Sequence, residues 1–171
     1  DTQNATWSAT PNAATIAVYT RCMVTVTRAN EFLLQSGSSS VEGIEGLRAE
    51  ARFLRAFAYY MLLDLYGNPP FATEENIGGE LPKQLDTNFS NGRKLLFEWI
   101  ESEMKDLLAN GEMPEMGEVS YPRVNKGAAQ ALSARMYLNA QVYTGTARWE
   151  DARSAAEATI KMGYSSCSNY E

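Results

Sequence analysis

The sequence predicts an all-α protein, a bundle of helices joined by long loops. Five segments place apolar residues three and four positions apart, the spacing that gives a helix one apolar face. No segment alternates apolar and polar residues as a half-buried strand does. Stretches rich in Gly, Pro, Ser and Asn separate the five segments. With 171 residues, 44% of them hydrophobic, the chain can bury a core of its own, so residues 1–171 are predicted to form one domain.

The first predicted helix spans about residues 13–35 and carries an apolar stripe from Ile16 to Leu33. Asn30 interrupts this stripe. Because a buried carboxamide needs hydrogen-bond partners, we expect Asn30 to find them inside the protein. A Ser-rich and Gly-containing loop, residues 36–40, follows the helix.

The second predicted helix begins at Glu42 or Leu47 and runs to Leu65, and it is apolar nearly all round. Gly67 and the pair Pro69-Pro70 stop it, because Gly closes a helix in the left-handed conformation and Pro cannot continue one. A helix without a polar face has to be surrounded by other helices. Its tyrosines, Tyr59, Tyr60 and Tyr66, are therefore expected to pack inside the protein.

Three side chains of this helix test that expectation. Leu54 and Leu62 should both be buried if other helices surround it. Arg55 stands in the middle of the apolar run. Since an unpaired buried charge is very costly, its guanidinium should pair with a carboxylate or a carbonyl.

A long irregular segment, residues 67–91, separates the second helix from a third at about residues 92–109. The third helix is amphipathic, and its acidic residues are predicted to form a solvated outer face: Glu98, Glu101, Glu103 and Asp106. A second loop, residues 110–124, carries Glu112, Glu115 and Glu118. Trp99, on the third helix, is expected in the core.

The fourth predicted helix, about residues 125–143, is rich in alanine, and the fifth spans residues 149–162. Small residues let helices approach closely, so the fourth helix, with Ala131, is predicted to be central. Trp149 is expected in the core. The two helices are similar to a tetratricopeptide pair, and the first two could form an equivalent hairpin; an ordinary bundle stays open as the alternative. The positions that fit the motif are Ala134, Tyr137, Ala152, Ala156 and Thr159.

The composition excludes several classes of function. The net charge is −6 and the 15 basic residues are scattered, which argues against nucleic-acid binding. The chain has no histidine, which removes the Ser-His and Cys-His catalytic arrangements and histidine metal sites. It has no dinucleotide-binding, phosphate-loop or Ca²⁺-loop motif, so neither a cofactor nor a metal is predicted. Pairs of carboxylates are the remaining route to catalysis, and an enzyme is not expected.

Trp7 is the candidate ligand-binding residue. It lies in a polar segment with amide and hydroxyl neighbours, residues 3–12, and sugars bind with their apolar ring face on Trp or Tyr. The alternative is that Trp7 anchors the N-terminal segment by packing. Cys22 and Cys167 could form a disulfide in an oxidising compartment, but two unpaired thiols are the simpler reading.

Five motifs, in this order, resemble the SusD/RagB family of Bacteroidetes surface nutrient-binding lipoproteins. The first is Asn30-Glu-Phe-Leu-Leu34, and the second is the signature helix from Ala49 to Phe71. The others are Ile100 with Asp106-Leu107, the helix from Lys126 to Ala140, and the element from Trp149 to Tyr164. The resemblance covers about residues 16–170.

This resemblance implies a partial chain, since family members are longer, begin with a lipidated cysteine and carry a C-terminal half with much of the ligand surface. It implies a non-catalytic glycan-binding protein at the cell surface of the outer membrane. Such a protein captures an oligosaccharide and hands it to a SusC-like TonB-dependent transporter, with its lipid anchor outside this chain. The alternative is a tetratricopeptide-like scaffold that binds a protein or peptide.

The loop of residues 67–91 is expected to lie on the surface, because loops of this length are disproportionately functional or mobile. It would contribute to the transporter contact or to the rim of the ligand site. The first is favoured because the loop has no Trp or Tyr beyond Tyr66. A plain solvated connector is the alternative.

Overall fold

The computed structural model describes residues 13–79, 81–110, 112–120 and 122–164, and over these residues it is helical. The elements are α1 (Ala13–Gln35), α2 (Ile44–Tyr66), the 3₁₀ turn η1 (Glu74–Asn76), α3 (Phe89–Ala109), α4 (Lys126–Leu138), α5 (Ala140–Thr144) and α6 (Trp149–Lys161). In the described part of the chain, the only extended pairing is an isolated antiparallel bridge between Phe71 and Lys83. The all-α prediction is confirmed.

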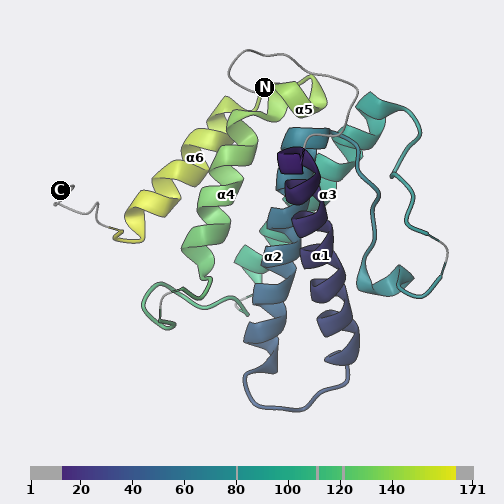
Figure 1. The fold of residues 1–171 in the computed structure, drawn as a ribbon. Coiled ribbons are helices and arrows are strands. Elements are labelled where there is room, and N and C mark those ends of the chain that lie inside the picture. Colours follow the sequence, from purple (N-terminus) through teal and green to yellow (C-terminus); the bar gives the residue numbers. More distant parts are fainter. Residues whose placement is uncertain (1–12, 80, 111, 121, 165–171) are drawn as a thin grey trace.

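The helices form two antiparallel pairs, α1 with α2 and α4 with α6 (Figure 1). α3 joins the pairs, because it packs against α2, α4 and α5. The segment between α2 and α3 runs along the outer side of the first pair and places η1 against α1 (Figure 1). Both predicted hairpins are present, and the predicted helical bundle with long loops is confirmed.

The ends of the helices follow from local chemistry. α2 ends at Gly67, whose φ of 78° suits glycine and whose N–H donates to the carbonyls of Leu62 and Leu63. A Cβ at Gly67 would overlap the ring of Phe89. α3 begins at Phe89, earlier than predicted, because the Asn88 side chain accepts the N–H of Asn91 at 3.0 Å and caps the helix.

The predicted fourth helix is divided in two. α4 ends at Leu138, and Asn139 leaves the helical path with ψ near 7° before α5 begins. α5 then closes at Gly145, which has a φ of 81°. The short α5 packs against α3, so the break turns the chain back over the bundle before α6.

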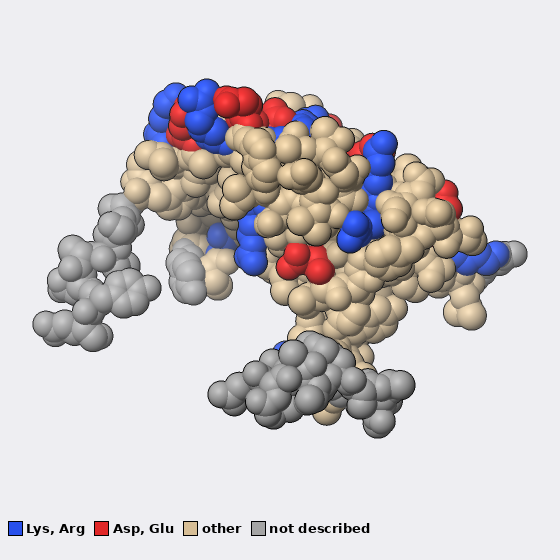
Figure 2. All heavy atoms as spheres, turned by 90° about the horizontal axis from the view of Figure 1, so that it is seen from above, with Lys and Arg blue, Asp and Glu red and all other residues tan. Residues whose placement is uncertain are grey.

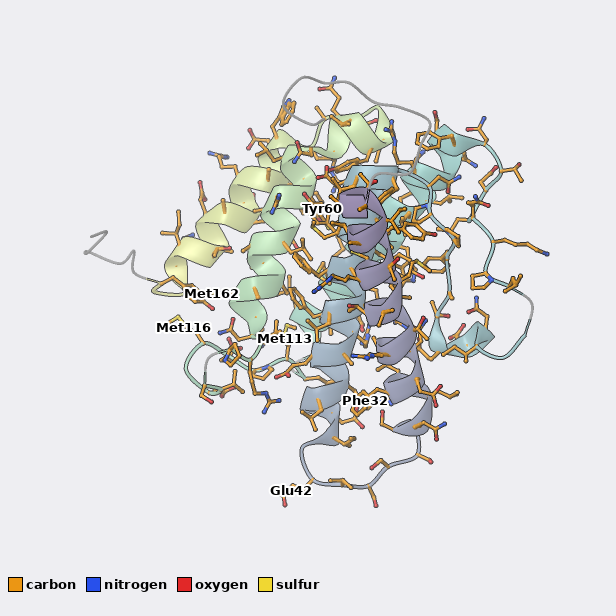
Figure 3. All side chains as sticks on the ribbon, in the orientation of Figure 1. Phe32, Glu42, Tyr60, Met113, Met116 and Met162 are labelled. Carbon is orange, nitrogen blue, oxygen red and sulfur yellow. The ribbon has the colours of Figure 1, made fainter. Side chains whose placement is uncertain are left out.

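One hydrophobic core lies between the helix pairs and α3. α2 contributes the largest part, including Tyr59 and Tyr60, and α3 supplies Leu96, Phe97 and Ile100. The loop before α4 adds Met113, which is fully buried. Figure 3 shows Tyr60 on the side of α2 toward α4, and Met113 beside the lower half of α2. Trp99 packs against this core, as predicted, and so does Tyr66.

Several residues predicted to be buried are exposed. Leu54 is 45% exposed and Trp149 is 53% exposed, whereas Leu62 is fully buried, as predicted. α1, α3 and α4 cover only part of α2, so Leu54 lies on an apolar stripe open to solvent, with Leu47, Phe57 and Leu65. The spacing of apolar residues identifies the faces of a helix but not which faces have a neighbour.

The small residues of α4 also divide between its faces. Ala131 is exposed, whereas Gly127 and Ala129 are buried and make the close approach. A Cβ at Gly127 would overlap the ring of Tyr164. The expectation that Ala131 marks a tight helix contact is therefore wrong, although α4 does pack closely against α6.

Charged side chains of both signs are mixed over the face seen in Figure 2, where no stripe of one sign is present. This distribution agrees with the argument against a nucleic-acid surface. None of the described helices combines the length and apolar character that crossing a membrane requires.

Leu62→Ala should lower the free energy of unfolding by about 2–5 kcal/mol, because it removes a fully buried side chain and leaves a cavity. Leu54→Ala is the matched control on the same helix and should cost less than about 1 kcal/mol, since its side chain is nearly half exposed. Equilibrium urea denaturation measures both changes. Equal losses for the two variants would contradict the observed orientation of α2.

Candidate functional site

A buried guanidinium lies where four elements meet. Arg55, on α2, is 3% exposed. Its Nη1 donates to Oδ1 of Asn30 on α1 at 2.7 Å and to the carboxylate of Glu74 on η1. Its Nη2 donates to Oε2 of Glu103 on α3 at 3.2 Å. The guanidinium also lies over the ring of Trp99, 5.3 Å from its centre. The predicted pairing of Arg55 is confirmed.

A second guanidinium, that of Arg52, extends this cluster along α3. Its Nη2 lies 2.9 Å from Oε1 of Glu103 and 2.6 Å from a carboxylate oxygen of Asp106. Burial alone would lower the pKa of Arg52, but the hydrogen bonds and negative charges of Glu103 and Asp106 raise it above its ordinary value. Arg52 and Arg55, which are about one turn apart on α2, therefore share the carboxylate of Glu103.

The acidic face predicted for α3 is only partly solvated. The side chain of Glu98 is half exposed, but those of Glu101 and Glu103 are mostly buried in ion pairs. Glu101 receives hydrogen bonds from Tyr137 on α4 at 2.9 Å and from Arg148, just before α6, at 3.1 Å. Burial alone would raise the pKa of Glu101, but these bonds and one from Lys105 lower it. These carboxylates therefore join helices.

Asn30 and Tyr59 hold the segment that follows α2. The Tyr59 hydroxyl donates to the carbonyl of Ala72 at 2.9 Å and accepts the N–H of the same residue at 2.7 Å. Nδ2 of Asn30 donates to the same carbonyl at 2.9 Å, so the predicted partners of Asn30 exist. Burial raises the pKa of Tyr59 to about 12, despite the opposing effects of the Ala72 bond and Arg55. The hydroxyl is therefore neutral and can donate at ordinary pH.

Phe71 fixes the same segment on its other side. Its ring meets the ring of Trp99 edge to face, with centres 4.9 Å apart, and the ring of Tyr59 at 5.1 Å. Its N–H donates to the carbonyl of Lys83 at 2.9 Å. The bridge ties the outgoing and returning parts of the segment together. Although long and irregular, the segment is attached to the core at Phe71, Ala72 and Glu74.

A hollow of about 590 Å³ lies within this segment. We call it the loop hollow. Its lining combines an aromatic ring and aliphatic side chains with two carboxamides, a carboxylate and an ammonium group. The lining residues are Phe71, Glu75, Asn76, Ile77, Gly78, Gly79, Leu81, Pro82, Lys83, Gln84 and Leu85.

The residues predicted from sequence to bind or to pair are placed as follows. Trp7 and Cys167 lie outside the described residues, so Trp7 stays a prediction. Cys22 is half-buried on α1, and burial raises the pKa of its thiol. In the described ranges, no group of three or more Cys, Asp or Glu side chains has an arrangement that could hold a metal ion.

Sequence reasoning missed the loop hollow and the partners of Arg55. The signals that could be read were Asn30 and Arg55, because each is a polar residue inside an apolar stripe. Nothing in the sequence around Glu74 distinguishes it from its neighbour Glu75, which is exposed. The expectation that the loop lies on the surface is correct for its tip, but its base is part of the core.

The fold and this geometry define a class of protein: an all-α module of tetratricopeptide-like helix pairs that carries a long, internally anchored loop. Comparison with known proteins gives the family. Residues 1–138 match the SusD-like family described as "Starch-binding associating with outer membrane". The chain belongs to this family.

Individual relatives agree with this assignment. The chain is 36% identical to the starch-binding protein SusD of Bacteroides thetaiotaomicron over 154 residues, and this matched region is 90% of the chain. A SusD-like protein of Bacteroides fragilis superposes with a TM-score of 0.67 over 86% of this chain at 25% identity. A SusD-like carbohydrate-binding protein of the same organism has a TM-score of 0.69 over 89% of the chain, and its 22% identity makes this a likeness of fold.

The chain spans about a quarter of the length of these relatives. It covers 26% of the curated SusD sequence, and 27% and 28% of the two solved chains.

Arg55→Met should lower the free energy of unfolding by about 3–5 kcal/mol, because it leaves Glu74 and Oδ1 of Asn30 without their buried partner and leaves Glu103 with Arg52 alone. Arg153→Met is the matched control: Arg153 also pairs with a carboxylate, but its side chain is 68% exposed, so its loss should cost about 0–1 kcal/mol. Urea denaturation compares the variants. A small loss for Arg55→Met would show that the cluster does not hold α1, α2 and α3 together.

Stability should fall in acid partly through Glu74. Burial alone would raise the pKa of Glu74, but its bonds from Arg55 and the nearby positive charges lower it below its ordinary value. A lowered pKa stabilises the folded state above the unfolded-state pKa, and that contribution is lost as the pH falls through the folded-state pKa. Between about pH 5 and pH 3, the free energy of unfolding should therefore drop less steeply in Glu74→Gln than in the unmodified chain.

The control is Glu157→Gln, on the exposed face of α6, which should keep the original slope. Identical slopes for all three proteins would contradict the role of Glu74.

Proposed function

We propose that this chain is the helical part of a non-catalytic, cell-surface glycan-binding lipoprotein of the outer membrane. It captures an oligosaccharide and hands it to a SusC-like TonB-dependent transporter, and a lipid anchor outside this chain attaches it to the membrane. The observation that carries the proposal is the 36% identity to a starch-binding protein across 90% of this chain. The family match over residues 1–138 supports it independently.

The state of the carboxylates supports a binding function without catalysis. A glycosidase needs one carboxyl group with a raised pKa, which donates a proton to the leaving oxygen, and a second one that faces the sugar. Here the pKa values of Glu74 and Glu101 are lowered by their cationic partners, and both groups are held in ion pairs that join helices. Such carboxylates stay ionised and serve packing.

Residues 1–171 form, in this proposal, a single SusD-like helical domain within a longer protein, and Trp7 contributes an aromatic platform to the glycan site. Helix pairs of this kind also occur in scaffolds that bind proteins or peptides. Membership of a starch-binding family favours glycan capture over that alternative.

The test uses the full-length protein in native gels that contain one polysaccharide each, starch among them. Glycan capture predicts that at least one polysaccharide retards the protein, that Trp7→Ala reduces the retardation, and that incubation releases no shorter sugars. Trp149→Ala is the matched control, since Trp149 is an exposed tryptophan at the start of α6 and its loss should leave retardation unchanged. Co-purification from outer membranes tests the transporter. Turnover of any glycan, or a stable protein complex without sugar binding, would contradict the proposal.

A further inference from the structure

We propose that the loop hollow is a subsite for a neutral saccharide, already shaped before the ligand arrives because the Arg55 cluster and the bridge to Lys83 hold its walls. This inference rests on the proposed function and adds to it a site, separate from Trp7, and a class of ligand. It is carried by three properties of the hollow: its lining, its attachment and its charge.

The lining suits a sugar ring. A pyranose has an apolar C–H face and a rim of hydroxyls, so its sites pair an aromatic or aliphatic surface with a few amide or charged groups. Phe71 and Pro82 supply the apolar surface. Asn76 and Gln84 supply carboxamides, a group that can both donate and accept hydrogen bonds. Within the described residues, the Gln84 side chain is exposed and has no hydrogen-bond partner. The volume of about 590 Å³ falls in the range of small-ligand pockets, roughly 300–1,000 Å³.

The attachment makes the hollow ready to bind. Phe71 is fixed by the rings of Trp99 and Tyr59, and its N–H is bonded to the carbonyl of Lys83, so both walls are tied together. η1, which contributes Glu75 and Asn76 to the lining, is attached through Glu74 to Arg55. The Asn76 carboxamide accepts the N–H of Thr73 at 2.9 Å and closes the turn. Ordering a loop of this length during binding would oppose affinity, and here the ordering occurs in folding.

The charge of the lining favours an uncharged ligand. Among the described lining residues, Glu75 brings one negative and Lys83 one positive charge, and the other side chains are neutral. The more buried charges of the region, those of Arg55, Glu74 and Glu103, form ion pairs with one another beneath the loop. A phosphate or an acidic sugar would meet no excess of positive charge, whereas a neutral oligosaccharide needs only the amide and carboxylate groups present.

The experiment compares three variants of the full-length protein, in gels and by calorimetric titration, against the polysaccharide that retards the unmodified protein. Gln84→Ala removes an exposed carboxamide of the lining, and Gln84→Trp fills the hollow with a bulky side chain. Gln141→Ala is the matched control, because Gln141 is an exposed glutamine on α5. Thermal unfolding and transporter co-purification are measured for each variant.

The proposal predicts a loss of affinity of about fivefold for Gln84→Ala, the usual effect of one hydrogen bond, and a larger loss for Gln84→Trp. Gln141→Ala should bind as the unmodified protein does, and all three variants should keep its unfolding temperature. Unchanged affinity with reduced transporter co-purification would overturn the subsite and assign the loop to the transporter contact. Unchanged values for both would overturn it in favour of a plain connector. Absence of binding by the unmodified protein to every polysaccharide would overturn the proposed function as well.

Discussion

The burial of one positive charge, that of Arg55, is the constraint on which this structure depends. A guanidinium that is almost wholly removed from water is tolerated only when it is paired and hydrogen-bonded. The partners of its two Nη atoms come from α1, η1 and α3, so pairing this charge fixes three elements relative to α2 at once. Its buried Nε has no hydrogen-bond partner among the described residues. Hydrophobic packing alone would allow these helices to slide, because apolar contacts have little direction. The fork of the guanidinium supplies the missing direction.

The same constraint explains how a long irregular segment can be ordered. Segments of this length without regular structure are commonly mobile. Here the backbone of Ala72 supplies the hydrogen bonds that the side chains of Asn30 and Tyr59 need. Glu74 supplies a negative charge to Arg55. The core would contain unsatisfied polar groups without the loop, and the loop would lose its position without the core. Order in the loop is therefore a consequence of the polar residues in α1 and α2.

The sequence was sufficient for the elements but not for their partners. Helix spacing and the stop at Gly67 predicted α1, α2 and α6 to within a few residues, and the polar exceptions Asn30 and Arg55 were recognised as buried and bonded. Glu103, a partner of Arg55, is 48 positions away from it, and periodicity carries no information over that separation. For the same reason Leu54 and Trp149 were wrongly placed in the core, and Glu101 was wrongly placed in solvent. The loop hollow was invisible, since tertiary contacts at Phe71 and Ala72 shape it.

The division of charge within the region bears on what the protein can do. Beneath the loop, Arg55 pairs with Glu74 and with Glu103, and the bonds from Arg55 lower the pKa of Glu74. These carboxylates are therefore engaged in pairs that join elements of the fold. The described lining of the loop hollow carries two carboxamides, the ring of Phe71, one carboxylate and one ammonium group. If the hollow binds a saccharide as proposed, its affinity comes from shape and hydrogen bonds, and the ligand leaves unchanged. A protein that passes an oligosaccharide onward has to bind it without cleaving it. Because Arg55 holds Glu74 and Glu103 beneath the loop, its placement links the stability of the bundle to the nearly neutral surface above it.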